Sequence, residues 1–222
     1  GELDGLSKKW FENGKLESEI NYKNGELDGL SKKWFENGKL ESKKNYKDGA
    51  LDGLCQKWYK NGQIWKEQYY SGNMPDSIKF YSQFSYQYER NAAEIGELDS
   101  SKWWYENGQI WKEGYYKEFK KDGSQKEWYE NGQLSLDCNY KDDELDGLCK
   151  EWFNNGKLKS KKNYKEFKKD GSHKEWHENG QLSLDCNYND GYLEGLYKTW
   201  YKNGQMSSQI NYEDNSENGL YK

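Results

Sequence analysis

The sequence predicts an all-β protein, an elongated single-sheet antiparallel meander of stacked β-hairpin repeats. Residues 4–16 return nearly letter for letter at intervals of 24 residues, and a fixed period of this length is typical of a repeat array. An Asn-Gly pair follows three residues after the tryptophan of each copy and a tyrosine follows after twelve. Asn-Gly between alternating apolar runs is a strong hairpin signal. The repeated tryptophans are Trp10, Trp34, Trp58, Trp104, Trp128, Trp152, Trp176 and Trp200.

Each repeat is expected to form a strand, a tight turn and a second strand, which in the first repeat are residues 6–12 and 15–22. We expect a type I′ turn at Asn13-Gly14, because Asn and Gly tolerate positive φ at both central positions. Residues 23–29, with two glycines and an aspartate, then turn the chain into the next repeat. This register pairs Phe11 with Leu16 and Trp10 with Glu17. Alternation places Phe11, Leu16, Ile20 and Tyr22 on one face, and Leu6 and Trp10 on the other.

The array is expected to have three parts and about eighteen strands. Residues 1–72 form three regular repeats, and residues 99–222 form five more with the start of a further one. Residues 73–98 hold Pro75 and Arg90, the only proline and the only arginine, and they lack Asn-Gly. We interpret this segment as a degenerate repeat or an irregular insertion. Residues 116–140 and 164–188 carry the same text apart from Gln125/His173 and Tyr129/His177, which indicates a copied block.

Composition indicates a thin, folded protein. Apolar residues are 32%, charged residues 33% and mean hydropathy −1.40, values that approach those of disordered chains. Aromatic residues at 17% argue for folding, because each buries a large area. The net charge of −5 argues against a general nucleic-acid binder, and no apolar run is long enough to span a membrane. The abundance of lysine over arginine suggests a bacterial source, with the chain either cytoplasmic or exported to the envelope.

The cysteines and histidines are expected to have no catalytic, metal-binding or cofactor role. We expect four reduced thiols that pack as small apolar residues, although Cys138 and Cys149 fall on successive strands and can approach each other. His173 and His177 differ from the copied block and lie four residues apart, about 13 Å on a strand, which is too far for one metal ion.

Two charged columns follow the repeats. Acids recur in the turns between repeats, where we expect solvated turn capping rather than a calcium ladder; they are Asp4, Asp28, Asp52, Asp146 and Glu194. Lysines recur two residues before the tryptophan, and interleaved acids favour a solvated face over a nucleic-acid site; they are Lys8, Lys32, Lys126, Lys150, Lys174 and Lys198.

An aromatic cluster brackets the irregular segment and is the candidate binding surface. Trp and Tyr dominate interface hot spots, so the cluster is predicted to contact a partner, while extra packing around an irregular repeat is the alternative interpretation. Exposed aromatic rings on a flat sheet also suit sugar rings. With Arg90, the candidate residues are Trp58, Trp65, Tyr69, Tyr70, Trp103, Trp104, Trp111, Tyr115 and Tyr116.

The run G-L-x-K-x-W-Y-x-N-G-x-L-x(5)-Y-x-x-G resembles the bacterial variant of the membrane occupation and recognition nexus (MORN) repeat, everywhere except about residues 73–98. The resemblance implies a β-hairpin array, and proteins with this variant are often described as YwqK-family antitoxins. Since the sequence lacks a P-loop, a serine elbow and a usable His-carboxylate pair, we expect a non-enzymatic protein-interaction module with another protein as partner. The alternatives are a cell-surface carbohydrate or envelope binder and a structural spacer.

Overall fold

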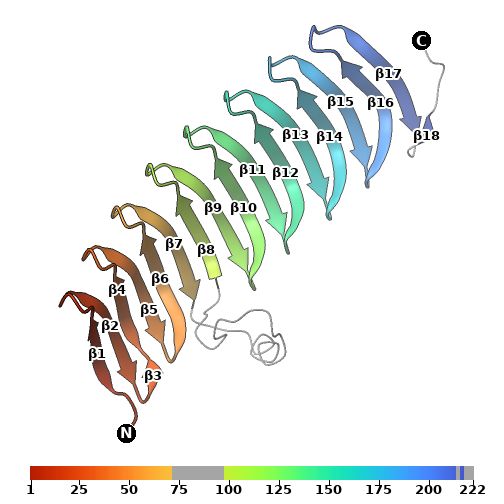
Figure 1. Cartoon of the computed structure of the whole chain (residues 1–222). Coiled ribbons are helices and arrows are strands. Elements are labelled where there is room, and N and C mark those ends of the chain that lie inside the picture. Colours follow the sequence, from red (N-terminus) through yellow and green to blue (C-terminus); the bar gives the residue numbers. More distant parts are fainter. Residues whose placement is uncertain (72–97, 214–215, 218–222) are drawn as a thin grey trace. The chain divides into compact units, whose positions relative to one another are not determined.

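The computed structural model describes residues 1–71, 98–213 and 216–217. The chain divides into two compact units, residues 1–119 (unit 1) and 120–222 (unit 2), and each is described by itself. Within the described residues every regular element is a β-strand. In each unit, successive strands lie side by side (Figure 1), and short turns join them except between β7 and β8, which residues 72–97 separate in the sequence.

Unit 1 has nine described strands: β1 (Gly5–Trp10), β2 (Leu16–Lys23), β3 (Glu26–Leu27), β4 (Gly29–Trp34), β5 (Leu40–Lys47), β6 (Ala50–Trp58), β7 (Ile64–Ser71), β8 (Leu98–Trp104) and β9 (Ile110–Lys117). Each strand pairs antiparallel with the next, except that β2 pairs with both the short β3 and β4.

Unit 2 repeats this pattern over nine described strands: β10 (Lys120–Trp128), β11 (Leu134–Lys141), β12 (Glu144–Trp152), β13 (Leu158–Lys165), β14 (Lys168–Trp176), β15 (Leu182–Asn189), β16 (Tyr192–Trp200), β17 (Met206–Glu213) and β18 (Ser216–Glu217). Every consecutive pair is antiparallel. The predicted fold class, an all-β antiparallel meander of stacked hairpin repeats, is confirmed in both units.

The two strands that flank the irregular segment are direct neighbours in the sheet of unit 1. β7 pairs with β8 from Lys66 opposite Trp103 to Tyr70 opposite Leu98. The predicted degenerate repeat at residues 73–98 lies, apart from Leu98, outside the described residues. The hairpin β6–β7 is therefore followed in the sheet by the hairpin β8–β9.

The predicted type I′ turn at Asn13-Gly14 is wrong. The Gly14 amide donates to the Phe11 carbonyl (2.9 Å), and the Phe11 amide donates to the Lys15 carbonyl (2.8 Å). Gly14 has a φ of 78°, whereas the φ of Asn13 is not positive. This is a three-residue loop, a type I turn followed by a glycine in the left-handed region. The Asn13 side chain accepts a bond from the Lys15 amide (3.0 Å), which holds the asparagine in the turn.

The type I′ geometry occurs at the other end of the hairpins. Consecutive residues with positive φ connect one hairpin to the next, as at Asn24 (50°) and Gly25 (83°). In unit 2 the same turn contains Glu166 (48°) and Phe167 (69°), where a bulky side chain occupies a conformation that L-residues rarely adopt. The two-residue length of these connections selects the primed turn type.

The predicted register is confirmed in the body of the hairpin and wrong beside the loop. Lys9 lies opposite Ser18, as the prediction requires, but Trp10 lies opposite Leu16 because a β-bulge shifts the register between Lys9 and Trp10. The bulge follows from the longer loop, since it leaves one extra residue, Glu17, on the second strand. Leu16 is therefore on the face of Trp10 rather than on the predicted one.

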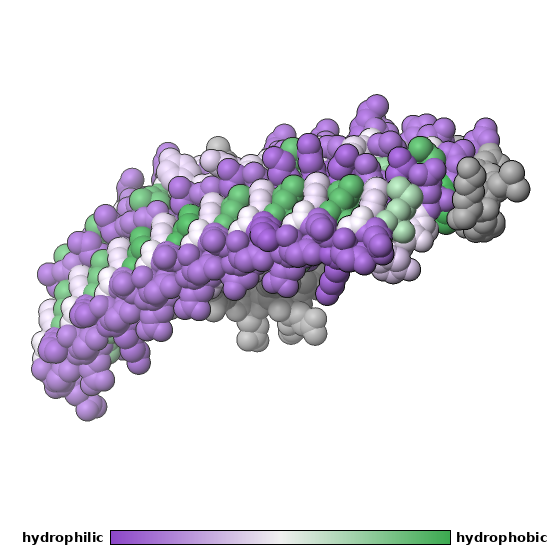
Figure 2. Space-filling view, turned by 90° about the horizontal axis from the view of Figure 1, so that it is seen from above, coloured by the Kyte–Doolittle hydropathy of each residue, from purple (hydrophilic) through white to green (hydrophobic). Residues whose placement is uncertain are grey.

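The two faces of the sheet are named here by their repeated aromatic residues. The tryptophan face carries the repeated tryptophan with its leucine partner and the lysine two residues earlier. The tyrosine face carries the repeated tyrosine, its glycine partner, and the positions three and one residues before the tryptophan. Leu6 and Trp10 fall on the first face and Ile20 and Tyr22 on the second, as predicted. Figure 2 shows hydrophobic stripes bordered by hydrophilic residues.

The most buried side chains belong to the tyrosine face, and several are small or polar. Cys138 is 0% exposed, Gln125 1% and Ser101 3%. In unit 1, Tyr46, Leu51, Cys55 and Tyr70 form a hydrophobic cluster. A single sheet excludes water here because each of these residues is covered by its neighbours along and across the strands.

In both units, several loop asparagines also join one hairpin to the next. In unit 1 the Asn13 side-chain amide donates to the Glu36 carbonyl (3.4 Å) and the Asn37 amide to the Lys60 carbonyl (3.1 Å). In unit 2 the Asn179 amide donates to the Lys202 carbonyl (2.6 Å). One side chain thus stabilises both its own turn and the contact with the following repeat.

Candidate functional site

Three tryptophans of unit 1 form a continuous ladder across β7, β8 and β9. The ring centroids of Trp65 and Trp103 are 5.8 Å apart and those of Trp103 and Trp111 6.0 Å, with interplanar angles of 78° and 79°. Tyr59 extends the ladder at Trp65 (6.2 Å) and Tyr105 extends it at Trp111 (6.0 Å). Such edge-to-face pairs contribute about 0.5–1.5 kcal/mol each beyond their buried area. These five residues are called the aromatic ladder below.

The bulges of β7 and β9 place Trp65 and Trp111 on the tyrosine face, and strand alternation places Trp103 there. Trp65 and Trp111 are the extra residues of the bulges in β7 and β9, and a bulge redirects the side chain it carries. Trp103 lies one residue before the repeated tryptophan Trp104, so alternation puts it on the tyrosine face. Trp111 remains 42% exposed.

Lysines lie over the same rings. The Lys66 ammonium is 3.9 Å from the centroid of the Trp103 ring, and the Lys57 ammonium is 5.6 Å from that of Trp65. Cation–π contacts of this kind contribute roughly 0.5–1 kcal/mol at exposed sites. The ladder therefore combines aromatic surface with positive charge at defined positions.

The other hairpins show that the fold does not require aromatic residues at these positions. Where β7 and β9 have Trp65 and Trp111, the bulge residue elsewhere is Glu17, Glu41, Ser135, Lys159, Ser183 or Ser207. Where β8 has Trp103, the other hairpins have Lys9, Lys33, Lys57, Glu127, Glu151, Glu175 or Thr199. All eight hairpins nevertheless form the same bulge. The ladder is a local specialisation of unit 1.

The predicted aromatic cluster is divided between the two faces. Trp65, Tyr70, Trp103, Trp111 and Tyr116 are on the tyrosine face, where Tyr70 is 8% exposed and packs in the hydrophobic cluster. Trp58, Tyr69, Trp104 and Tyr115 are on the tryptophan face. Arg90 lies outside the described residues.

Tyr59 and Tyr105 belong to the ladder although they were not among the residues predicted from the sequence. Both occupy the position after the repeated tryptophan, where every hairpin has an aromatic residue or histidine, so no local signal separates them. Their link to the ladder depends on the bulge, which the predicted register omitted. Tyr59 also donates its hydroxyl to the Trp104 carbonyl (2.9 Å), and burial raises its pKa.

A second specialisation lies on the tryptophan face. Tyr69 and Tyr115 are 50% and 56% exposed and occupy the place that asparagine fills in the other hairpins. There the asparagine amide bonds the neighbouring strand, as Asn21 does with the Leu30 carbonyl (2.7 Å). Ser100 pairs with both tyrosines, so the two tyrosines are separated by two strand spacings, about 10 Å.

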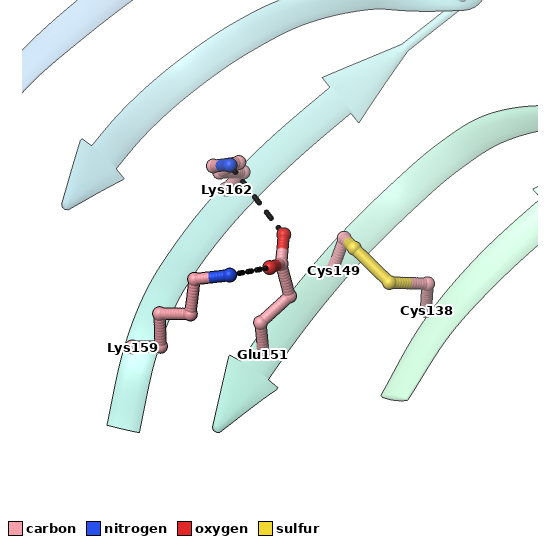
Figure 3. Close-up of a disulfide and its surroundings, with 5 residues drawn as sticks. All are labelled: Cys138, Cys149, Glu151, Lys159 and Lys162. Atoms are coloured by element: carbon pink, nitrogen blue, oxygen red, sulfur yellow. Dashed lines mark ion pairs between the residues drawn. A yellow bond between two sulfur atoms is a disulfide. The ribbon is translucent and has the colours of Figure 1, made fainter. Parts of the chain in front are cut away.

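In unit 2, a disulfide replaces the predicted pair of free thiols. Cys138 and Cys149 lie opposite each other on β11 and β12, with Cα atoms 4.0 Å apart, and their sulfur atoms are bonded (Figure 3). The prediction of four reduced thiols is therefore wrong for this pair, because the register brings two cysteines of neighbouring repeats directly together. Cys55 and Cys186 remain free and buried, and burial raises the pKa of Cys186 to about 11.

Beside the disulfide, unit 2 carries a connected set of ion pairs. Glu151 pairs with Lys159 (3.1 Å) and Lys162 (3.5 Å), as Figure 3 shows. Lys162 also reaches Glu175 (3.5 Å), which contacts the His173 ring (3.0 Å). Although burial opposes it, the pKa of Glu151 is lowered by Lys159 and Lys162, and that of Glu175 by its hydrogen bond to His173 and by Lys162. Burial lowers the pKa of His173. The arrangement pairs charges on the tyrosine face of unit 2.

The two histidines have separate environments. His173 is 4% exposed and lies 5.6 Å from the Tyr188 ring. His177 contacts the Trp200 carbonyl through Nε2 (2.8 Å), and Tyr129 makes the equivalent contact with the Trp152 carbonyl (2.7 Å). His177 thus takes the structural place of the tyrosine in the copied block. Within the described residues, no group of three or more His, Cys, Asp or Glu side chains is arranged to hold a metal ion.

Hydrogen bonds and ion pairs of the two charged columns agree with the predicted turn capping and the predicted interleaving of lysines with acids. Asp28 accepts a bond from the Asp48 amide (3.4 Å), which is turn capping between repeats. On the tryptophan face, lysines of the predicted column pair with acids, as Lys8 does with Glu19 (3.0 Å) and Lys174 with Asp185 (3.2 Å).

Together these features define a β-hairpin repeat protein whose specialised surface lies in unit 1. The MORN repeat variant model matches eight segments, which together cover more than half of the chain: residues 3–24, 27–48, 51–71, 100–118, 121–142, 145–166, 169–190 and 193–214. The chain therefore belongs to the MORN repeat variant family. The match also supports a repeat-based binding module. No curated protein matches the chain, and among the described residues no helix is long and apolar enough to cross a membrane.

Proposed function

We propose that this chain is a non-enzymatic module that binds another protein through the aromatic ladder of unit 1. The observation that carries the proposal is the restriction of the ladder to two neighbouring hairpins, β6–β7 and β8–β9, of an array that folds elsewhere without it. Residues that the fold does not require, and that expose aromatic surface, are typical of a binding site.

The ladder has the composition expected of an interface centre. Tryptophan and tyrosine are the residues most enriched in hot spots, and the surrounding polar rim excludes water. Trp111 is the most exposed tryptophan of the ladder, at 42%, and is the expected anchor. Trp65 and Trp103 hold it from one side through successive ring contacts, so little side-chain entropy is lost when a partner covers it.

We further propose that binding serves occlusion, in the manner of a bacterial antitoxin or immunity factor. A sheet surface with anchors on adjacent strands can cover an active site without chemistry of its own. The resemblance to YwqK-family antitoxins supports this finer assignment. Under this proposal the chain needs no cofactor, and its partner is a protein rather than nucleic acid.

The test is a comparative capture from lysate and envelope fractions of the source cells. The full chain is compared with a triple variant that restores array residues, Trp65→Ser, Trp103→Glu and Trp111→Ser. We expect one protein to be captured in stoichiometric amount by the native chain and at least tenfold less by the variant. A matched control, Tyr69→Asn with Tyr115→Asn, changes the opposite face and is expected to keep the partner. Failure of the native chain to retain any stoichiometric protein would refute the proposal.

The exposed pair Tyr69 and Tyr115 supports a second candidate function, carbohydrate binding. Two half-exposed rings about 10 Å apart can stack on two alternate sugar residues of an extended glycan. Titration of tyrosine and tryptophan fluorescence with envelope glycans tests this, with the Tyr69→Asn, Tyr115→Asn variant as control. An unchanged signal with every glycan removes this candidate.

A further inference from the structure

Four residues form one row across β6, β7, β8 and β9 on the tryptophan face of unit 1. Leu54 lies opposite Tyr69. Ser100 lies opposite both Tyr69 and Tyr115. Leu54, Tyr69 and Tyr115 are 41%, 50% and 56% exposed, and Ser100 is small, so it covers little of the ring on either side. The row therefore presents apolar and aromatic surface to solvent, and it is called the exposed row below.

The fold does not require tyrosines in this row. The other six hairpins have asparagine where these two have Tyr69 and Tyr115, and the asparagine amide bonds the neighbouring strand, as Asn45 does with the Leu54 carbonyl (3.0 Å). Tyrosine has no amide with which to make this bond. Because each ring remains half exposed, the two tyrosines bury less apolar area than packing residues do, and exposed aromatic surface of this kind is typical of a binding site.

A polar band borders the exposed row on the same face. It lies two residues away along each strand, about 7 Å from the row, and it consists of Gln56, Glu67, Lys102 and Glu113. The Gln56 side-chain amide donates to the Glu67 carboxylate (2.7 Å), and the Lys102 ammonium lies 3.5 Å from the Glu113 carboxylate. A carboxylate has several lone pairs, so the band can accept further bonds from hydroxyl groups. With two acids and one lysine, the band disfavours an acidic ligand.

The separation of the two rings distinguishes glycans by their linkage. Tyr69 and Tyr115 lie on strands two spacings apart, about 10 Å. In a β-1,4-linked chain of equatorially substituted pyranoses, each sugar advances the chain by slightly more than one strand spacing and is turned over relative to the sugar before it. Alternate sugars therefore present the same face at nearly the separation of the two rings. Chains with α-1,4 or β-1,3 linkages curve, so their alternate sugars do not present the same face along a straight line.

We infer that the exposed row binds consecutive sugars of a neutral β-1,4-linked chain of glucose or N-acetylglucosamine, with alternate sugars on Tyr69 and Tyr115 and the sugar between them over Ser100. This inference rests on the candidate carbohydrate-binding function and names the ligand class of that site. The axial C–H groups of these sugars pack on the electron-rich faces of aromatic rings, and their equatorial hydroxyl groups donate to the polar band. Stacking uses the exposed ring surface and does not require a free tyrosine hydroxyl.

The test is titration of the full chain with soluble oligosaccharides, followed by intrinsic fluorescence and by calorimetry. The main probes are β-1,4-linked oligomers of glucose and of N-acetylglucosamine with two, three and six sugars. Hexamers of α-1,4-linked glucose, β-1,3-linked glucose and β-1,4-linked mannuronate are the comparison probes, and the last of these is acidic. The variant Tyr69→Asn, Tyr115→Asn restores the residue of the other hairpins. A matched control, Tyr192→Asn with Tyr201→Asn, removes two exposed tyrosines of unit 2 (51% and 60%). Circular dichroism and urea unfolding confirm that each variant is folded.

We expect the β-1,4-linked hexamer of one or both neutral sugars to bind. Affinity is expected to rise roughly tenfold or more between two and three sugars, because three sugars are the shortest chain that reaches both rings. The Tyr69→Asn, Tyr115→Asn variant is expected to bind the hexamer at least about tenfold more weakly than the native chain, and the matched control is expected to bind it as the native chain does.

Two outcomes overturn the inference and leave the candidate carbohydrate-binding function intact. One is equal or tighter binding of a comparison hexamer, and the other is an affinity that does not change between two and three sugars. Binding that survives in the Tyr69→Asn, Tyr115→Asn variant refutes this site for any glycan. If no glycan produces heat or a change in fluorescence, both the inference and the candidate function are refuted.

Discussion

Reduction of the Cys138–Cys149 disulfide is expected to destabilise unit 2 selectively. The bond closes a loop with a sequence separation of 11 residues. In the chain-entropy account, a closed loop of this length stabilises the folded state by about 2.8 kcal/mol at 25 °C. Small proteins lose about 1–3 kcal/mol of stability per molar urea, so the unfolding midpoint should fall by roughly 1–3 M.

The measurement has two stages on the full chain. Thiol titration in urea without reductant is expected to detect two thiols, those of Cys55 and Cys186, and four after reduction. Urea unfolding is then followed with and without reductant, with hydrogen exchange to resolve β10–β13 from the strands of unit 1. The variant Cys138→Ser, Cys149→Ser should behave like the reduced native chain and should not respond to reductant.

Detection of four thiols before reduction would refute the reasoning at once, because the two cysteines would then be reduced in the native protein. An unchanged midpoint after confirmed reduction would refute the loop-entropy argument instead. Two thiols would also favour an exported protein, since disulfides persist in oxidising compartments.

Three further predictions concern unit 2. Phe167→Gly should raise the unfolding free energy by about 1 kcal/mol, because Phe167 has a φ of 69° and left-handed φ costs an L-residue about 1–2 kcal/mol; the reverse change, Gly191→Phe, should lower the urea midpoint. His177→Phe should cost about 1 kcal/mol by removing the bond to the Trp200 carbonyl, whereas His177→Tyr should leave the midpoint unchanged. Burial lowers the pKa of His173 below its usual 6.5, so the unfolded chain binds more protons and stability should fall as pH drops through 6.5. His173→Gln, the residue of the copied block, should flatten urea midpoints measured between pH 7.5 and 5.5, and an unchanged slope would contradict this.

The repeat period was sufficient to predict the strands, because each hairpin has the same residues at the same places. It did not predict the loop type. Asn13-Gly14 is compatible with both a two-residue and a three-residue loop, and the choice depends on whether Phe11 pairs with Lys15. That backbone bond is a property of the whole hairpin rather than of the dipeptide.

The candidate site was predicted in composition but not in arrangement. The one-residue shift beside the loop decides which face each aromatic residue occupies, so the predicted cluster combined Trp65 with Tyr69 although they face opposite sides. The face that each aromatic side chain occupies depends on the register of the paired strands, which the repeat period alone does not give.

The double role of the loop asparagine makes the array sensitive to chemical ageing. An Asn-Gly sequence is prone to deamidation, because glycine leaves the following backbone nitrogen open to attack on the side-chain amide. Conversion of Asn37 to a carboxylate would keep its bond to the Lys39 amide (2.9 Å) but remove the donor that reaches the Lys60 carbonyl (3.1 Å). Deamidated protein should therefore lose side-chain hydrogen bonds between adjacent hairpins, while the loop within each hairpin keeps its own hydrogen bond.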